Sequence, residues 1–439
     1  MNEKVMDIPT SATVAEPAVA KAPAVAIAPA MAIAPAAQAG PSEGFRETLR
    51  SYPTIYHLRE CARRRLPGFA FDAGDGGVGA DKGIQRNWNA LDAVELMPKY
   101  GVTRGLPPTG VDLFGYRYAA PVGIAPMGSP GIVWPHADEY LAQAAQKANV
   151  PYNLSTVSGM SIEDAAKHAP DVFWLQLYRF PKNDFAIGFD LARRAAAVGA
   201  KALVITLDVP VRTTRTREVL SGISSPFRFT PKMIMQALGS PSYCAAFLRH
   251  GIPRFGNFFK YAGNMSLNDM SKFIQGESGG AFTWEDVARY RDVWKGPLIV
   301  KGIMHPEDAE KAVSLGCEGI QVSNHGGRQV EGLPATIDVL PGVAAAVNGR
   351  AKIIFDSGVR SGLDVVRAMA LGADMVLAGK AFLWSLGAMG GAGPGHALEL
   401  FIDEMRATLG QIGVRTFEEA RRVPIRHNTE FKLGSECSL

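Results

Sequence analysis

Eight short apolar runs, most of them separated by segments with helical periodicity, constrain the fold of this chain more than any other feature. Segments such as ADEYLAQAAQKA, LARRAAAVGA and HPEDAEKAVSLG lie between them. Continuous apolar strands that are each followed by a helix are typical of a parallel sheet covered by helices. The predicted strands are residues 120–126, 151–156, 172–178, 202–208, 297–302, 319–324, 352–357 and 375–379.

Eight units of this kind predict an α/β fold, the (β/α)8 TIM barrel. The alternative is an open, doubly wound sheet. Sheets of that class often carry a GxGxxG turn after the first strand, and no GxGxxG opens the first unit here. The sequence therefore favours the closed barrel.

The rest of the chain divides into a tail and a leading segment. Residues 1–42 are rich in Ala, Val and Pro. Repeated Pro breaks a helix, and the segment lacks the uninterrupted apolar core of a secretory signal. We therefore predict a disordered, extended tail. Residues 43–66 carry a helix-like pattern with basic residues, and a Gly-rich loop spans residues 73–79. We expect one barrel domain over residues 43–439, with an N-terminal leading segment before the first barrel strand.

A long insertion, about residues 211–296, interrupts the repeat after its fourth strand. From Val211 to Ala262 it contains eight Lys or Arg and one Glu, together with the apolar stretches MIMQAL and YCAAFL. Two interpretations are open. The insertion is either a disordered or self-folded excursion over the barrel mouth, or a basic amphipathic patch that lies on an anionic membrane surface.

Composition excludes several classes of protein. The chain has 439 residues, 47% of them hydrophobic, which is ample for a large core. A net charge of +4 is too small to suggest a nucleic-acid partner. No run of about 18 apolar residues predicts a membrane-spanning helix. The four cysteines lack CxxC or zinc spacing, so we expect no metal site. We expect them to be reduced thiols in a cytoplasmic protein; they are Cys61, Cys244, Cys317 and Cys437.

Polar residues gather where the predicted strands end. Barrels of this type carry their chemistry at the carboxyl ends of the strands, and core packing alone would not place so many polar groups at one rim. These residues are Ser155, Gln176, Tyr178, Asp208, Lys301, His325 and Asp356.

The stretch VSNHGGRQ, residues 322–329, is the strongest functional signal. His325 can move a proton near neutral pH. Arg328 can hold a carboxylate through two hydrogen bonds, and the intervening glycines let the backbone approach a ligand closely. Taken alone, His325 could instead cap a loop, with Arg328 in solvent.

The string SNHGGRQ resembles the signature of the FMN-dependent 2-hydroxy-acid dehydrogenase and oxidase family, which includes glycolate oxidase, bacterial L-lactate dehydrogenase and mandelate dehydrogenase. The resemblance extends over nearly all of residues 50–425. It implies FMN as the cofactor and oxidation of an (S)-2-hydroxy acid, lactate- or mandelate-like, to the 2-oxo acid. Electrons would pass to a quinone or another carrier. The alternatives are an oxidase that makes hydrogen peroxide, an FMN enzyme for a different substrate, and a non-catalytic flavin protein.

The same resemblance implies partners and a location. Lactate and mandelate dehydrogenases pass electrons to membrane quinones, so we expect a cytoplasmic protein with peripheral contact to the inner membrane. Members of the family are often tetramers, so a homo-oligomer is expected by analogy.

Residue roles are also implied by the resemblance. His325 would be the catalytic base, and Asp208 would stabilise its imidazolium form. The substrate would be bound by Tyr178, Arg215 and Arg328. Lys301 would lie beside the flavin and favour its reduced form. The implied cofactor-binding residues are Pro126, Met127, Gly128, Ser155, Gln176, Thr206, Lys301, Ser323, Asp356, Ser357, Gly358, Arg360, Gly379 and Lys380.

Part of the cofactor site can be argued from the residues themselves. DSGVRSG follows the seventh predicted strand, and the eighth ends in AGKA. Backbone N–H groups of these Gly-containing turns, with Arg360 and Lys380, would hold a phosphate between the two strands. Each turn alone could equally be an ordinary connection between a strand and a helix.

Several positions depart from the family pattern. Ala73 stands where the family usually has a substrate-binding tyrosine, so either a neighbour replaces that tyrosine or the substrate is different and larger. Lys380 replaces a phosphate-binding arginine, and Ser357 replaces a glycine. Val157 stands where glycolate oxidase has a tryptophan, and Gly128 matches a small-residue variant that reacts weakly with oxygen.

Overall fold

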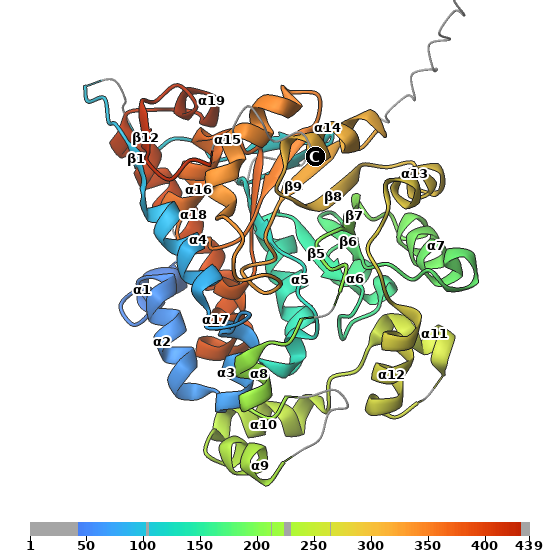
Figure 1. Ribbon diagram of the computed structural model, residues 1–439. Helices are drawn as coiled ribbons and strands as arrows, with labels where there is room; N and C mark the ends of the chain where they lie inside the picture. Colours follow the sequence, from blue (N-terminus) through green and yellow to red (C-terminus); the bar gives the residue numbers. More distant parts are fainter. Residues whose placement is uncertain (1–42, 102–104, 212, 224–229, 264, 432–439) are drawn as a thin grey trace, which may run out of the picture. The chain divides into compact units, whose positions relative to one another are not determined.

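The computed structural model describes residues 43–101, 105–211, 213–223, 230–263 and 265–431 (Figure 1). The predicted tail, residues 1–42, and Cys437 lie outside the described residues.

Eight parallel strands close into a barrel in the order β10-β11-β4-β5-β6-β7-β8-β9, so each strand pairs with its neighbour along the repeat. All eight predicted strands are confirmed, and barrel closure excludes the open doubly wound sheet. The strands are β4 (Val122–Ile124), β5 (Tyr152–Ser155), β6 (Phe173–Leu177), β7 (Ala202–Thr206), β8 (Leu298–Ile303), β9 (Gly319–Val322), β10 (Lys352–Phe355) and β11 (Met375–Ala378).

Helices surround the barrel on the outside (Figure 1). Local signals fix where several of them begin: Ser161, Thr283 and Ser361 each cap a first turn with a side-chain oxygen that accepts a backbone N–H. The helices that follow barrel strands are α5 (Ala137–Ala148), α6 (Ile162–His168), α7 (Lys182–Ala197), α13 (Trp284–Val293), α14 (Pro306–Ser314), α15 (Thr336–Val347), α16 (Gly362–Ala370), α17 (Lys380–Met389) and α18 (Gly393–Ile412).

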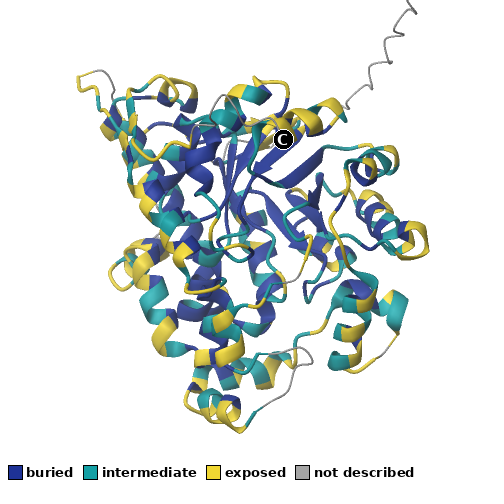
Figure 2. Ribbon diagram, in the orientation of Figure 1, coloured by how far each residue is buried: buried dark blue, intermediate teal, exposed yellow. Residues whose placement is uncertain are grey.

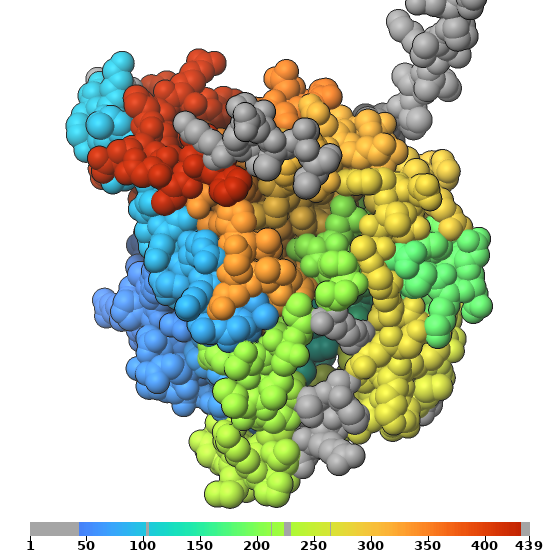
Figure 3. Space-filling view, in the orientation of Figure 1, coloured from blue at the N-terminus to red at the C-terminus, as the bar shows by residue number. Residues whose placement is uncertain are grey.

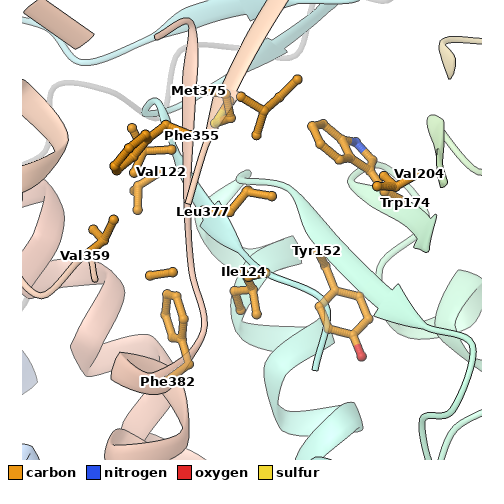
Figure 4. Packing of buried hydrophobic residues seen from close by; sticks show 14 of the residues in the cluster. Val122, Ile124, Tyr152, Trp174, Val204, Phe355, Val359, Met375, Leu377 and Phe382 are labelled. Carbon is orange, nitrogen blue, oxygen red and sulfur yellow. The ribbon is translucent and has the colours of Figure 1, made fainter. Parts of the chain in front are cut away.

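The core lies in the barrel and between its strands and helices, where the ribbon is buried throughout (Figure 2). Figure 4 shows this packing: Val122, Leu377 and Phe382 are fully buried, or nearly so, among their neighbours. Burying one such side chain contributes about 1.5–3 kcal/mol. Because side chains face the barrel interior on one side and helices on the other, the strands are apolar at nearly every position, which explains the continuous runs in the sequence.

The leading segment folds against one side of the barrel. The predicted helical pattern over residues 43–66 becomes two helices, because Pro53 and the N-cap Thr54 separate them. The predicted Gly-rich loop, residues 73–79, is wrong in its first three residues. There α3 continues to Asp75, since its buried Phe69 and Phe71 pack into the core. The segment comprises α1 (Glu43–Leu49), α2 (Ile55–Arg65), α3 (Gly68–Asp75), α4 (Lys82–Asp92), β1 (Val94–Leu96), β2 (Val111–Leu113) and β3 (Tyr116–Tyr118).

Two small antiparallel pairs were not predicted. One joins β2 to β3, and the other joins β1 to β12 (Ile425–His427), near the end of the described chain. The second pair is formed by segments more than 300 residues apart, and periodicity within a short window cannot indicate such a partner.

The insertion after β7 folds into short helices that pack on the barrel. Tyr243 is buried, and its hydroxyl donates to the Ile132 carbonyl at 2.9 Å. Asn257 is also buried and accepts from the backbone N–H of Ile162 at 2.9 Å. The disordered alternative therefore does not hold for the described part. The helices are α8 (Thr216–Leu220), α9 (Pro231–Leu238), α10 (Pro241–His250), α11 (Phe259–Ala262) and α12 (Leu267–Glu277).

The outer face of the insertion is unusually apolar. Met235 and Leu238 on α9 are 74% and 70% exposed, and Leu248 on α10 is 88% exposed. Figure 3 shows these helices, in green to yellow, along one edge of the domain. In the part of the chain that the structure describes, none of the helices combines the length and apolar character needed to cross a bilayer.

Candidate active site

A cavity of about 350 Å³ opens at the carboxyl ends of the barrel strands. Most of the site residues predicted from the sequence line it. These are Pro126, Met127, Gly128, Tyr178, Arg215, Lys301, His325, Arg328, Asp356, Ser357, Gly358, Arg360, Gly379 and Lys380. Five predicted residues do not line it: Ser155, Gln176, Thr206, Asp208 and Ser323.

Asp208 and Ser323 instead support the lining residues Lys301 and His325. The Lys301 ammonium lies 3.3 Å from Asp208 Oδ2 and 2.9 Å from Ser323 Oγ. His325 Nδ1 lies 3.0 Å from Asp208 Oδ1, and the His325 backbone N–H donates to Ser323 Oγ. A lysine, a carboxylate and a histidine thus form one compact, buried cluster.

Charge in this cluster determines which groups carry protons. Burial would raise the pKa of Asp208, but the Lys301 and His325 charges outweigh it and hold that pKa well below its ordinary value. Burial and then the Lys301 ammonium lower the pKa of His325, against the opposing effect of Asp208. His325 is therefore neutral at neutral pH, so one of its ring nitrogens can accept a proton.

The same contacts indicate which nitrogen of His325 is free to accept a proton. Asp208 is ionised and can only accept, so the Nδ1 that faces it carries the proton. Nε2 is then the unprotonated nitrogen. Lys301 Nζ, 3.4 Å from Nδ1, acts on the ring by its charge rather than by a hydrogen bond.

Ser155, Gln176 and Thr206 form a row across three adjacent strands. Gln176 accepts from Ser155 Oγ at 2.9 Å and donates to Thr206 Oγ1 at 2.7 Å. Thr206 in turn is in register with Lys301 on the next strand. All of these side chains are buried, so the row fixes the orientation of the Gln176 amide beside the catalytic cluster.

Two arginines and a tyrosine form the anion-binding end of the cavity. Arg328 and Arg215 both line it, and burial raises the pKa of Tyr178, which keeps its hydroxyl protonated as a donor. Arg328 Nη1 donates to the carbonyls of Ala73 and Gly76, at 3.3 and 2.5 Å. Burial first, and then Arg215, lower the pKa of Arg328 to about 10, so it stays charged at neutral pH.

Sequence reasoning missed Glu218, which also lines the cavity. Its Oε1 accepts from Arg328 Nη2 at 2.5 Å and from Arg215 Nη1 at 3.2 Å. The signal was present, because Glu218 lies three residues after Arg215, a spacing that brings two side chains together on a helix.

Glycines allow the leading segment to pack closely against residues 323–329 after β9, here called the catalytic loop. The Val78 backbone N–H donates to the Gly327 carbonyl at 3.1 Å. A Cβ on Gly77 would lie 2.7 Å from that same carbonyl oxygen. Gly327 has φ 71°, and a Cβ there would lie 2.7 Å from the Ile84 backbone nitrogen, so neither position has room for a side chain.

At the other end of the cavity, Arg360 is prepared for an anion. It is 4% exposed, and its Nε, which lies 3.7 Å from Asp364 Oδ2, has no hydrogen-bond partner among the described residues. Its guanidinium lies over the rings of Tyr56 and Trp88, and its Nη2 donates to Asp92 at 3.0 Å. An unpaired buried N–H is costly, and a phosphate oxygen is a suitable acceptor for it.

Lys380 begins α17, directly after Gly379. Its ammonium donates to the carbonyls of Asp75 and Gly76, at 2.9 and 2.7 Å. Burial first, and then the Arg328 charge, hold the pKa of Lys380 well below its ordinary value. Among the described residues no carboxylate forms an ion pair with this ammonium, and Asp75 and Asp81 oppose the lowering of its pKa only partly. A phosphate at the N-terminus of α17 would supply a closer counter-charge.

The two residues between Asp356 and Val359 have left-handed backbone. Ser357 has φ 85°, and its Oγ accepts from the Gly326 N–H and donates to Asp356. Gly358 has φ 88°, and a Cβ there would lie 2.9 Å from Asn87 Cβ. Ser357 thus connects this turn to the catalytic loop through a side chain that glycine lacks.

Asn87, Trp88 and Trp384 are further lining residues that the sequence did not indicate. Asn87 and Asn324 are both buried and exchange side-chain hydrogen bonds of 2.9 and 2.7 Å. This pair joins α4 of the leading segment to the catalytic loop.

The residues present fit a phosphate-bearing flavin. The orphaned Arg360 Nε, the under-neutralised Lys380 and the N-terminus of α17 suit the phosphate. The buried Ser155–Gln176–Thr206 row and Lys301 suit the polar edge of a flavin ring. FMN, when bound, supplies the two-electron sink that no protein side chain provides.

Comparison with known proteins agrees with this geometry. The family model for FMN-dependent dehydrogenases matches residues 62–427. The L-lactate dehydrogenase of Caulobacter vibrioides is 40% identical over 360 residues, covering 82% of this chain and 93% of the relative. That of Chromohalobacter salexigens is 39% identical over 363 residues, covering 82% and 92%.

Solved structures extend the likeness to mandelate enzymes. The monotopic membrane protein (S)-mandelate dehydrogenase superposes with a TM-score of 0.81 at 32% identity, covering 85% of this chain and 99% of that one. A mandelate oxidase gives 0.73 at 33% identity, covering 86% and 99%. The resemblance stated from SNHGGRQ is thereby confirmed. With FMN as its cofactor, the chain belongs to the family of FMN-dependent 2-hydroxy-acid dehydrogenases.

Proposed function

We propose that this FMN-dependent 2-hydroxy-acid dehydrogenase acts on (S)-2-hydroxy acids with a bulky apolar side chain and converts them to 2-oxo acids. The observation that carries this proposal is the apolar wall of the cavity that also holds His325 and Arg328. Ala73 leaves room at its position, and Ile132, Val133, Val157 and Ile223 line the same space. Each buried CH₂ of a substrate side chain would add about 0.8 kcal/mol of binding.

We assign the proton transfer to His325. Its Nε2 would take the proton of the substrate, and the ionised Asp208 on Nδ1 would stabilise the imidazolium that forms. Arg328, Arg215 and Tyr178 would bind the substrate carboxylate and orient the carbon that is oxidised. Lys301 would keep its positive charge beside the flavin, because Asp208 and Asp356 raise its pKa against the effect of burial.

Steady-state kinetics with a soluble electron acceptor test this substrate class. The ratio kcat/KM should rise from glycolate to lactate to longer aliphatic acids and (S)-mandelate, with little turnover of (R)-mandelate. A preference for glycolate over all larger acids would exclude a bulky apolar substrate.

For the electron acceptor we propose a quinone in a membrane to which the protein binds peripherally. The support is the exposed apolar face of α9 and α10, with the exposed basic residues Lys232 and Arg249 beside it. A structural neighbour is itself a monotopic membrane protein. We therefore propose that the enzyme lies in the cytoplasm and is attached to the inner membrane through α9 and α10.

Sedimentation with vesicles that contain anionic lipid tests the membrane contact. The double variant Leu238→Ser and Leu248→Ser should remain in the supernatant while the wild type sediments. Leu106→Ser removes a side chain of similar exposure, 67%, outside the insertion and serves as the control. Equal sedimentation of all three proteins would exclude the insertion as the contact.

We also propose that residues 43–439 act as one FMN-binding domain and that the protein is a homo-oligomer, by analogy a tetramer. Light scattering on the purified holoenzyme measures the mass directly. A mass of one chain, 46.9 kDa, would contradict the oligomer.

A further inference from the structure

A carboxylate of the chain itself occupies the anion-binding end of the cavity. Glu218 Oε1 lies 2.5 Å from Arg328 Nη2 and 3.2 Å from Arg215 Nη1. These are the two arginines assigned to the substrate carboxylate. The Glu218 side chain is only 18% exposed and lines the same cavity as His325, so this is not a solvent-screened surface pair.

Glu218 leaves little of Arg328 available. One terminal nitrogen of Arg328 already donates to the carbonyls of Ala73 and Gly76, and the other pairs with Glu218. A substrate carboxylate that reaches the same guanidinium must therefore displace Glu218 or lie beside it. Two carboxylates held together at a partly buried site repel each other strongly.

The backbone that carries Glu218 is firmly attached to the leading segment. Arg217, the preceding residue, pairs with Asp72, Asp75 and Asp81 at 2.6, 2.7 and 3.2 Å. The Ser221 hydroxyl also bonds to Asp72. These contacts hold α8 in place on both sides of Glu218, so displacement requires rotation of one side chain rather than movement of the helix.

We propose that Glu218 is an internal competitor for the substrate carboxylate, so that an acid needs contacts elsewhere in the cavity to bind tightly. The proposal rests on the substrate-binding roles assigned to Arg215 and Arg328. Displacing Glu218 costs binding free energy whichever acid binds. An acid with a large apolar side chain offsets this cost by contacts with the cavity wall. A small acid has no such contacts and binds weakly.

The test measures anion binding without turnover. Oxalate has no hydrogen on its carbon atoms to lose, so it binds to the oxidised holoenzyme without reducing it, and the flavin absorption spectrum reports its Kd. Glu218→Gln keeps the shape of the side chain and removes the competing charge. We expect the Kd of oxalate to fall about tenfold or more, which is a modest change for removal of one charge-assisted contact.

Two further variants make the result specific. Glu218→Asp keeps the charge but withdraws it by one CH₂, so its Kd should lie between those of the wild type and Glu218→Gln. Glu163→Gln removes a carboxylate that pairs with Arg194 and does not line the cavity, and its Kd should equal that of the wild type. If Glu218→Gln and Glu218→Asp both bind oxalate no tighter than the wild type, Glu218 supports the arginines and the proposal is wrong.

Steady-state kinetics supply a second readout. In Glu218→Gln the KM for lactate and the KM for (S)-mandelate should both fall, by about the same factor, because each acid displaces the same carboxylate. If neither KM value falls, Glu218 does not compete with the substrate carboxylate and the proposal is wrong. Oxalate binding needs no turnover. The Kd of oxalate therefore still tests Glu218 if the enzyme oxidises neither lactate nor (S)-mandelate.

Discussion

His325 shows how a single residue is prepared for its proposed role. Its φ of 58° lies in the left-handed region, and Gly326 and Gly327 continue that conformation. Such backbone costs about 1–3 kcal/mol at a non-glycine residue. The hydrogen bonds of His325 to Ser323 and Asp208 hold it there. A strained histidine with a lowered pKa at a cavity wall is a strong candidate for a catalytic group.

The pH dependence of kcat/KM should report the base. Because burial and Lys301 lower the pKa of His325, activity should be complete above its ordinary value of 6.5 and fall as pH decreases through a lower pKa. In Asp208→Asn the carboxylate that raises this pKa is gone, so the acid limb should move further down in pH. An acid limb centred above 6.5 in the wild type would contradict this assignment.

Ala73 permits a direct change of specificity at one position. In Ala73→Tyr a phenol should occupy part of the cavity near Arg328 and donate to a small substrate carboxylate, as the resemblance to the family implies. We expect KM for glycolate and lactate to fall severalfold and KM for (S)-mandelate to rise, by effects of about 1–2 kcal/mol each. Ala73→Val, which adds bulk without a hydroxyl, is the control. A fall of all three KM values in both variants would argue against the hydroxyl.

Among the elements, the connection between α4 and the catalytic loop is the least expected. Asn87 on α4 and Asn324 before His325 exchange two buried hydrogen bonds. Gly358, from the turn after β10, fits against Asn87 where no Cβ would. Three segments far apart in the sequence thus hold one another in the positions that the site requires.

Removal of half of this pair should destabilise the protein. Asn87→Ala removes two buried hydrogen bonds, while Asn324 keeps the Gly327 N–H and the Pro334 carbonyl as partners, so the free energy of unfolding should fall by about 1–3 kcal/mol. Asn89→Ala, two residues along the same helix and exposed, should change it by less than about 0.5 kcal/mol. Urea denaturation of the holoenzymes measures both. Equal effects of the two variants would show that the pair contributes little.

Elements were predictable from the sequence where their burial was uniform. The eight barrel strands are buried along nearly their whole length, so the apolar runs indicated them to within about two residues at each end. The extension of α3 to Asp75 was missed because glycines around Ala73 suggest a loop, whereas packing of Phe69 and Phe71 favours a helix. Tertiary packing overrode local propensity there.

At the scale of the whole molecule, the barrel brings residues that are far apart in the sequence together in one site. Residues at the carboxyl ends of different strands were predicted to converge because they share an edge of a closed sheet, and most of them line one cavity. Glu218 carried a signal in its spacing from Arg215, but Asn87 and Trp88 could not be placed, because they come from the leading segment. Their positions depend on packing that no periodicity encodes.

FMN should stabilise the whole barrel because its site draws on residues from many strands. At a free FMN concentration of 100 Kd, a ligand that binds only the folded state adds about 2.7 kcal/mol. Removal of FMN should therefore lower Tm by several degrees, and readdition should restore it. Calorimetry of the two forms checks this, and an identical Tm would contradict a cofactor held by the barrel rim.

Anaerobic reduction of the flavin by single 2-hydroxy acids, followed near 450 nm, tests the proposed reaction and its base together. We expect rapid bleaching by a bulky (S)-2-hydroxy acid, slow bleaching by glycolate, and loss of bleaching in His325→Ala with the flavin still bound. Reduced flavin that persists after air is admitted would agree with a dehydrogenase, and rapid recovery would indicate an oxidase. Undiminished bleaching in His325→Ala would exclude His325 as the base, and no bleaching of the wild type by any acid would exclude the reaction.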